Sequence, residues 1–192
     1  MEVVTRKLKA SLLVTLDGVV QDPGGFGETD QGGWAGPFFT DEARQSAYEQ
    51  VMAADYFLCG RLTYELLSKA WGNVSGSDYL DRVNAMPKLV ASRTLTGRLE
   101  WNATVIDGDV AEAIRKLKQE PGGDIVLYGS ASFMQTLMKH DLIDEFRISI
   151  HPIVLGRGKR LFPEVGETAR LRLAGAKALD SGVTILTYLP AD

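Results

Sequence analysis

The sequence predicts an α/β protein in which helices cover both faces of a mixed sheet. Short apolar runs, typical of buried strands, alternate with helical patterns along most of the chain. The last two apolar runs are joined by Asp180-Ser181-Gly182, a sequence typical of a hairpin turn. Alternating strand and helix units favour parallel pairing, so we expect a mostly parallel sheet with antiparallel C-terminal strands. The length of 192 residues predicts a single domain, residues 1–192.

The first half of the chain should supply two strand–helix units, with a long loop between the strand and the helix of the first. Residues 8–16 are mostly apolar and end at Asp17-Gly18, as expected for a buried strand. Six glycines and two prolines in residues 21–39 predict a mobile loop. Thr40 is a suitable N-cap for a helix that runs to about residue 52. The remaining elements expected here are a strand over 55–59 and a helix over 62–68.

The second half repeats the pattern and ends in strands. Its clearest helix is residues 109–119, where Val110, Ala113, Ile114 and Leu117 share one face. A helical pattern also begins directly after the apolar run 125–128. The expected strands are 88–92, 104–106, 125–128, 144–154, 170–177 and 183–189.

Composition excludes several classes of function. The net charge of −4 argues against nucleic-acid binding, which needs a basic surface. The single cysteine, Cys59, excludes an internal disulfide and a multi-cysteine zinc site, and we expect no metal. The N-terminus shows neither a signal peptide nor a long apolar stretch, so we expect a cytoplasmic protein without membrane contact. Late strands that need edge protection make a homodimer the expected assembly.

Small and polar residues follow three of the expected strands. If these strands run parallel, the three turns lie along one edge of the sheet, where α/β proteins bind nucleotides. Glycine lets a phosphate approach the backbone, a helix N-terminus attracts its charge, and arginine binds it with paired donors. Each turn alone could be an ordinary surface turn, but three together favour a phosphate-bearing ligand. The candidate residues are Gly60, Arg61 and Thr63; Ser92, Arg93 and Thr94; and Gly129, Ser130, Ala131 and Ser132.

The order of these motifs resembles the dihydrofolate-reductase-like superfamily. The matching segments are Ser11 to Gly18, Cys59 to Glu65, Pro87 to Thr94 and Gly123 to Gly156. The last segment is most similar to the reductase domain of the bifunctional riboflavin-biosynthesis protein. The resemblance covers about residues 7–189 and implies a three-layer α/β/α sandwich that binds NADPH. It places the first and third turns at the pyrophosphate and the turn around Arg93 at the adenosine 2′-phosphate.

The resemblance leaves the proton donor and the substrate open. Dihydrofolate reductases carry a carboxylate on their first helix, which points to Asp41, although an acidic residue there is also a helix-dipole partner. Asp17 is the second candidate, and an Asp-Gly turn is its alternative explanation. Trp34, in the glycine-rich loop, is expected to be exposed and to cover the nicotinamide or a flat substrate. One cysteine cannot supply the zinc ligand pair of the deaminase half of the riboflavin protein.

The sequence therefore predicts an NADPH-dependent reductase that transfers hydride to a small heterocyclic or carbonyl substrate. The most similar named activity is reduction of 5-amino-6-(5-phosphoribosylamino)uracil. Two alternatives stay open at this point. One is dihydrofolate reduction, and the other is a non-catalytic protein that binds or senses NADPH.

Overall fold

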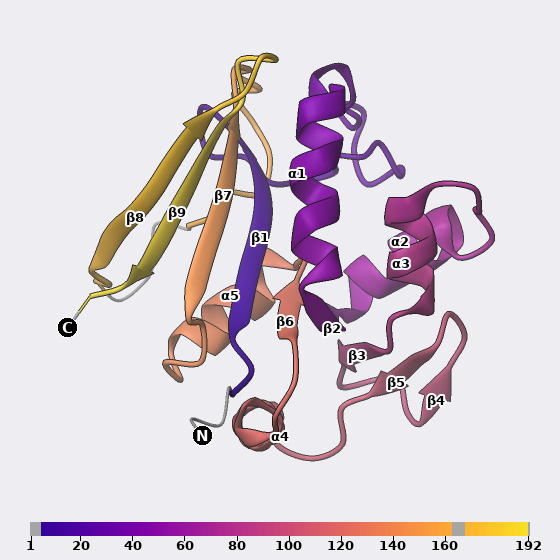
Figure 1. The fold of residues 1–192 in the computed structure, drawn as a ribbon. Coiled ribbons are helices and arrows are strands. Elements are labelled where there is room, and N and C mark those ends of the chain that lie inside the picture. Colours follow the sequence, from indigo (N-terminus) through magenta and orange to yellow (C-terminus); the bar gives the residue numbers. More distant parts are fainter. Residues whose placement is uncertain (1–4, 163–167, 192) are drawn as a thin grey trace. The chain divides into compact units, whose positions relative to one another are not determined.

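The computed structural model describes residues 5–162 and 168–191 and shows an α/β fold with a mixed sheet, as predicted (Figure 1). The chain forms two compact units, each built from two separate stretches. Unit 1 comprises the residues up to Ala10 together with Ala47–Asp144, and unit 2 comprises Ser11–Ser46 together with the residues from Glu145 onward. Strand β1 (Leu8–Thr15) and helix α1 (Asp41–Met52) contribute residues to both. The prediction of a single domain stays a prediction.

The strands of unit 1 are ordered β4-β5-β3-β2-β6-β1. The pairs β3–β5, β2–β3, β2–β6 and β1–β6 are parallel, and the short β4 is antiparallel to β5. Because β3, β2 and β6 are parallel neighbours, their carboxyl ends lie along one edge, as the sequence predicted. The strand bounds are β2 (Ala54–Gly60), β3 (Lys88–Ala91), β4 (Arg98–Leu99), β5 (Ala103–Val105) and β6 (Asp124–Leu127).

The helices of unit 1 cover the sheet on both faces. Helix α4 (Val110–Gln119) is capped by Asp109, whose side chain accepts the Glu112 N–H over 2.8 Å. The helix buries Ala111 and Ile114. Helix α5 (Ala131–Met138) buries Phe133, Met134 and Leu137. The other two are α2 (Arg61–Trp71) and α3 (Asp78–Ala85).

Helix α3 was not predicted from the sequence. It has only eight residues, of which Val83 alone is buried, so its apolar pattern spans little more than two turns. Tertiary contacts hold it instead: the Arg82 guanidinium donates to the carbonyls of Val51 and Ala54.

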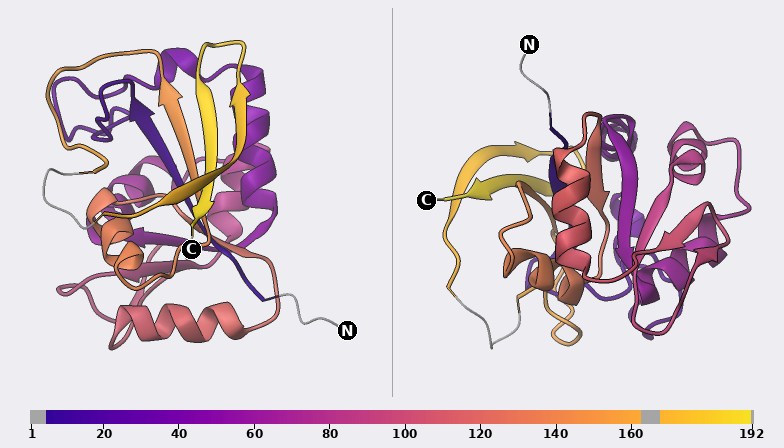
Figure 2. Two further views of the ribbon diagram at one scale, coloured as in Figure 1. Left: turned by 90° about the vertical axis from the view of Figure 1, so that its left-hand side faces the viewer. Right: turned by 90° about the horizontal axis from the view of Figure 1, so that it is seen from below.

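Unit 2 contains β7 (Glu145–His151) and the predicted C-terminal hairpin of β8 (Leu171–Ala178) and β9 (Thr184–Pro190). Strand β9 pairs antiparallel with both β7 and β8. The register shifts between Leu173 and Gly175, and the hairpin curves strongly (Figure 2). Leu179, Val183 and Ile185 form a buried cluster against Phe38 and Ala43.

The glycine-rich loop is more structured than its composition suggested. The buried Asp22 carboxylate accepts the backbone N–H groups of Phe26, Glu28 and Thr29, which folds the loop around one side chain. A short 3₁₀ helix (Gly36–Phe38) follows. In residues 5–162 and 168–191, no helix has the length and apolar character needed to cross a membrane.

Candidate functional site

Two of the predicted turns interlock at the carboxyl ends of β2 and β6 in unit 1. The Gly60 N–H donates to the Gly129 carbonyl over 3.0 Å. A Cβ on Gly60 would lie 3.3 Å from Ser130 Oγ, so a side chain at this position would require Ser130 to shift by a few tenths of an ångström. One hydrogen bond and one tight contact thus join two turns that lie about seventy residues apart in the sequence.

Gly129 is tightly constrained by the other turn. Its φ of +126° is a conformation that favours glycine, and a Cβ there would lie 3.2 Å from Thr63 Oγ1. The peptide bond between Gly129 and Ser130 is cis. Backbone and small side chains therefore line the space between the turns, which suits close approach of a phosphate group.

Helix α5 presents its N-terminal amide groups at this turn. Ser130 is the N-cap, and its Oγ accepts the Phe133 N–H over 3.4 Å and lies 2.9 Å from Ser132 Oγ. The remaining N–H groups of the first turn of α5, including that of Ala131, are oriented for an anion. Two hydroxyls and a helix N-terminus thus meet at the end of β6.

The two predicted arginines stand at the ends of β2 and β3. Arg61 begins α2, and its side chain is half-exposed; Nη1 donates to both carboxylate oxygens of Glu65, over 2.9 and 3.0 Å. Ser92 Oγ accepts the backbone N–H groups of Thr94 and Leu95, over 3.1 and 2.9 Å. This closes a tight turn that leaves Arg93 exposed.

These residues fit a phosphate-rich nucleotide. The glycines leave room at the backbone, α5 and α2 both begin at the turns, and each neighbouring strand end carries an arginine. All ten predicted cofactor residues belong to unit 1 and lie at the carboxyl ends of three adjacent parallel strands. Their role in binding stays a prediction, but the sequence brought together residues that the fold places at one sheet edge.

In unit 2, Asp17 is locked to a neighbouring loop. Its carboxylate accepts the Thr15 hydroxyl over 2.6 Å and the backbone N–H groups of Leu155 and Gly156 over 3.2 and 2.8 Å. The hydroxyl first, and the amide groups after it, lower the pKa of Asp17 to about 2. An acid this strong is ionised at neutral pH, so the geometry favours loop attachment over proton donation.

Asp41 lies at the start of α1, where the sequence placed it. Its carboxylate is fully exposed and contacts the Arg44 guanidinium at 2.8 Å. This is the arrangement of a solvated carboxylate near a helix N-terminus. A catalytic role for Asp41 stays a prediction.

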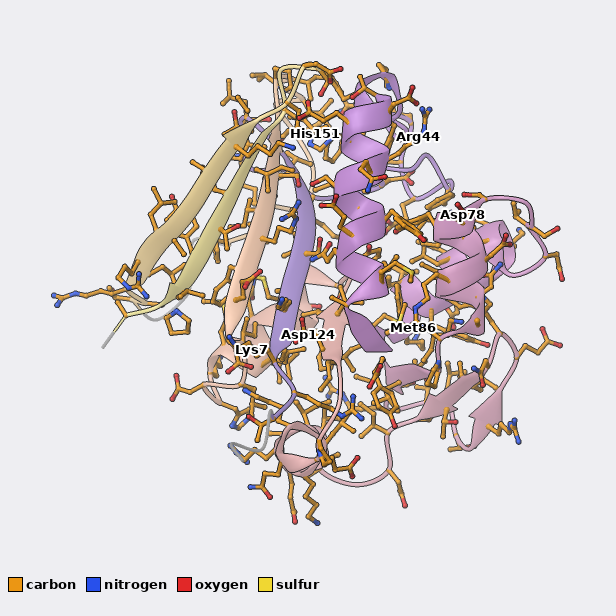
Figure 3. The ribbon with its side chains drawn as sticks, viewed as in Figure 1. Lys7, Arg44, Asp78, Met86, Asp124 and His151 are labelled. Atoms are coloured by element: carbon orange, nitrogen blue, oxygen red, sulfur yellow. The ribbon has the colours of Figure 1, made fainter. Side chains whose placement is uncertain are left out.

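The expectation that Trp34 is exposed is wrong. The side chain is only 5% exposed, and its indole N–H donates to the Gln21 carbonyl over 2.8 Å. Its ring packs edge-on against the buried His151 ring, with 5.1 Å between the ring centres. His151 is the last residue of β7 (Figure 3). Because the flanking turns fold back on Asp22, a loop tryptophan becomes part of a small core. A direct substrate contact by Trp34 stays a prediction.

Sequence reasoning missed two polar features of unit 1. The hydroxyls of Tyr79 and Tyr128 lie 3.0 Å apart, and Tyr128 is the residue before Gly129 in the sequence. Lys88 is almost fully buried, with its ammonium 4.4 Å from the Trp101 ring centre and donating to the Asn84 carbonyl over 2.8 Å. Burial lowers the pKa of Lys88 to about 8. Neither feature has a local motif, because the partners are brought together by tertiary structure.

Comparison with known proteins decides the family. A family model described as the RibD C-terminal domain matches residues 6–185. The chain belongs to the RibD C-terminal domain family. The match spans both structural units. Two Bacillus subtilis (strain 168) relatives are similar over most of their length, and both are described as uncharacterized. YyaP is 33% identical, and the match covers 95% of this chain and 94% of YyaP. YwjB is 29% identical, and the match covers 94% of this chain and 96% of YwjB.

Solved structures establish the same fold. A protein from Shewanella sp. PV-4, described only as a candidate riboflavin biosynthesis protein, superposes with a TM-score of 0.73 at 22% identity, covering 97% of this chain and 99% of that one. The Thermotoga maritima diaminohydroxyphosphoribosylaminopyrimidine deaminase/5-amino-6-(5-phosphoribosylamino)uracil reductase superposes with a TM-score of 0.67 at 15% identity. The match covers 97% of this chain and 57% of that one. Dihydrofolate reductase from Enterococcus faecalis, solved with NADP(H), superposes with a TM-score of 0.64 at 16% identity, and the match covers 97% of each chain. The predicted dihydrofolate-reductase-like fold is confirmed.

Proposed function

We propose that this protein is an NADPH-dependent reductase that transfers hydride to a small heterocyclic or carbonyl substrate. The single observation that carries the proposal is the interlocked pair of turns, in which Gly60 and Gly129 leave space that a Cβ would fill. The family supports a reductase of the type found in riboflavin synthesis, and reduction of the phosphoribosylamino-uracil is the most similar named activity. A homodimer and a cytoplasmic location stay predictions.

The two interlocked turns, residues 60–63 and 129–132, would form a cradle for the cofactor, and different residues would bind its different parts. Thr63, Ser130, Ser132 and the first amides of α5 would bind the diphosphate, together with Arg61. Arg93, exposed on its turn, would read the 2′-phosphate. When bound, NADPH supplies the hydride, and the protein supplies position and electrostatic stabilisation.

Arg61 would bind the diphosphate in competition with Glu65. The carboxylate already accepts two hydrogen bonds from Nη1, so a phosphate must share or displace it. An exposed ion pair of this kind contributes little free energy, roughly 0.2–1 kcal/mol, so displacing it costs little. The pair can therefore hold the arginine near the cradle without blocking it.

NADPH oxidation tests the proposal and its alternatives together. The purified protein is mixed with NADPH and a set of acceptors that includes dihydrofolate, the phosphoribosylamino-uracil, a cyclic imine and an aromatic aldehyde. Oxidation that depends on one of these acceptors supports the reductase. Turnover of dihydrofolate alone would favour dihydrofolate reduction. Tight NADPH binding with no acceptor-dependent oxidation would favour a sensing protein and contradict the proposal.

A further inference from the structure

The three strands of unit 2 carry their charged side chains on one face only. Cross-strand partners project from the same face of a sheet, so the register of β7, β9 and β8 sorts their side chains. One face contains the rows Arg147–Thr187–Gly175 and Ser149–Ile185–Lys177 and the pair Leu189–Arg172. The other, called the uncharged face below, contains Phe146–Tyr188–Leu173, Ile148–Leu186–Ala176, Ile150–Thr184–Ala178 and Pro190–Leu171. None of these residues of the uncharged face, all within the described strands, is charged.

Helix α1 covers the charged face. The Arg147 guanidinium donates to Ser46 Oγ, and Lys177 Nζ lies 2.9 Å from Glu42 Oε1. Ser46 and Glu42 both belong to α1. The part of α1 that belongs to unit 2 therefore packs on the face that carries the charges, and it leaves the uncharged face to other partners.

The uncharged face becomes more exposed from β7 toward β8. On β7, Phe146 and Ile148 are buried, whereas Leu186 and Tyr188 on β9 are partly exposed. On β8, the last strand of the sheet, Leu173 is 51% exposed (Figure 1). A sheet normally buries its apolar face against a second layer, and contiguous apolar surface that stays exposed marks an interaction site.

The charge distribution favours a second copy of this chain as the second layer. The protein has a net charge of −4, so two copies repel each other where their charged surfaces meet. Around a two-fold axis a surface meets itself, and the uncharged face does so without bringing like charges together. A membrane is less suitable, because anionic lipids attract basic residues beside an apolar surface, and Arg172 and Lys177 lie on the other face.

The shape of β8 favours stacking of two faces over pairing of two strand edges. The register shift between Leu173 and Gly175 disturbs β8, and irregularities of this kind protect a sheet edge from pairing. Two apolar sheet faces pack about 10 Å apart with interdigitating side chains. On the uncharged face, the large side chains of Leu173, Leu186 and Tyr188 stand beside the small Ala176, which provides the relief for such packing.

We propose that the uncharged face is the interface of a homodimer, in which two copies stack this face around a two-fold axis. The inference goes beyond the proposed reductase function and does not depend on it. The uncharged face belongs to unit 2, whereas the ten predicted cofactor residues belong to unit 1. The homodimer expected from the sequence thereby gains a defined surface, and single substitutions on that surface can test it.

Sedimentation velocity of the full chain without cofactor is the first test. At about 10 µM protein we expect one species with about twice the chain mass of 21.0 kDa. A monomer at every concentration up to about 100 µM would overturn the proposal. A continuous series of larger species would overturn it too, because it would indicate open pairing of strand edges instead of a closed two-fold dimer.

Two neighbouring residues of β8 provide a matched pair of variants. Leu173→Glu places a carboxylate on the uncharged face, where dimerisation would bury it without a partner. The dissociation constant of the dimer should therefore rise by at least about a hundredfold. Arg172→Glu introduces the same residue on the opposite face and changes the net charge more, because it also removes a positive charge. We expect Arg172→Glu to dimerise like the wild type.

Circular dichroism melting separates loss of the dimer from loss of the fold. Leu173→Glu should melt cooperatively as a monomer, because the leucine side chain is half-exposed. If it does not fold, Ala176→Glu, at an exposed position of the same face, takes its place. A folded face variant that dimerises like the wild type, or an equal loss in Arg172→Glu, would overturn the proposal. A wild-type monomer that co-sediments with phosphatidylglycerol vesicles would make a membrane the partner and would also overturn it.

Discussion

Thr63 Oγ1 lies 3.2 Å from the position that a Cβ on Gly129 would occupy. These two residues belong to different turns, after β2 and β6, and the hydrogen bond from Gly60 to Gly129 fixes the separation of the turns. The relationship explains why a glycine and a small hydroxyl residue stand together at this edge. It also makes Gly129 the position where a single methyl group should disturb the cradle most.

Gly129→Ala should therefore weaken NADPH binding by about tenfold or more, equivalent to at least about 1.4 kcal/mol. The new methyl group meets Thr63, and alanine resists a φ of +126°. Gly76→Ala is the matched control, because Gly76 also has a positive φ, +88°, but has open space around it. Fluorescence titration with NADPH measures both variants. Equal affinity in the two would show that the contact with Thr63 does not shape the site.

Cofactor choice should depend on Arg93. The 2′-phosphate distinguishes NADPH from NADH, and a charge-assisted hydrogen bond to it contributes about 1.5–3 kcal/mol. Arg93→Ala should weaken NADPH binding about ten- to hundredfold and leave NADH nearly unchanged. Arg61→Ala should weaken both cofactors alike, since the diphosphate is common to them. Calorimetric titration measures the affinities. If Arg93→Ala lost the same affinity for both cofactors, Arg93 would not bind the 2′-phosphate.

Buried Lys88 should make stability rise with pH just above neutrality. Its pKa is lowered by burial to about 8 in the folded protein, below its ordinary value of 10.5. Between these values the unfolded chain binds more protons than the folded one, so the free energy of unfolding increases as the pH rises. From pH 7 to pH 9 the gain from this group should be about 1 kcal/mol.

Urea unfolding of wild type and Lys88→Met at the two pH values measures this gain as a difference. Lys88→Met should lose the increase, whereas Lys177→Met, an exposed lysine paired with Glu42, should keep it. The buried Cys59, whose pKa burial raises to about 12, acts in the opposite direction above about pH 9, so the measurement stops there. The same pH dependence in Lys88→Met and wild type would contradict a lowered pKa.

Asp17 should act as the attachment point of the loop at residues 155–156. Asp17→Asn replaces one accepting oxygen by a donor, which cannot bond to the backbone N–H groups of both Leu155 and Gly156. The variant should have a lower melting temperature at pH 7. Because the folded pKa is lowered to about 2, the wild-type advantage is present above about pH 4 and is lost as the pH falls toward 2.

Melting temperatures at several pH values test this, with Asp30→Asn as the control. Asp30 forms an exposed ion pair with Arg157, the residue after Gly156, so its loss should cost little. If Asp17→Asn and Asp30→Asn melt at the same temperature, the carboxylate of Asp17 does not hold the loop.

The sequence predicted most of the sheet because its strands are local apolar runs. The three turns at the cofactor edge were found for the same reason: each follows such a run directly, and parallel pairing brings them together. Features that depend on distant partners were missed. Trp34 became a core residue through Asp22 and His151, helix α3 has a single buried residue, and the Tyr79–Tyr128 pair joins residues 49 positions apart. No local pattern records such partners.

A crystal structure of the protein soaked with NADPH tests the central claim most directly. We predict that the diphosphate lies at the N-terminus of α5, within hydrogen-bond distance of Thr63 and Ser130, and that the 2′-phosphate lies beside Arg93. The nicotinamide ring should then lie at the carboxyl end of β6. A diphosphate bound away from Gly60 and Gly129, or crystals that take up no NADPH at saturating concentration, would contradict the account.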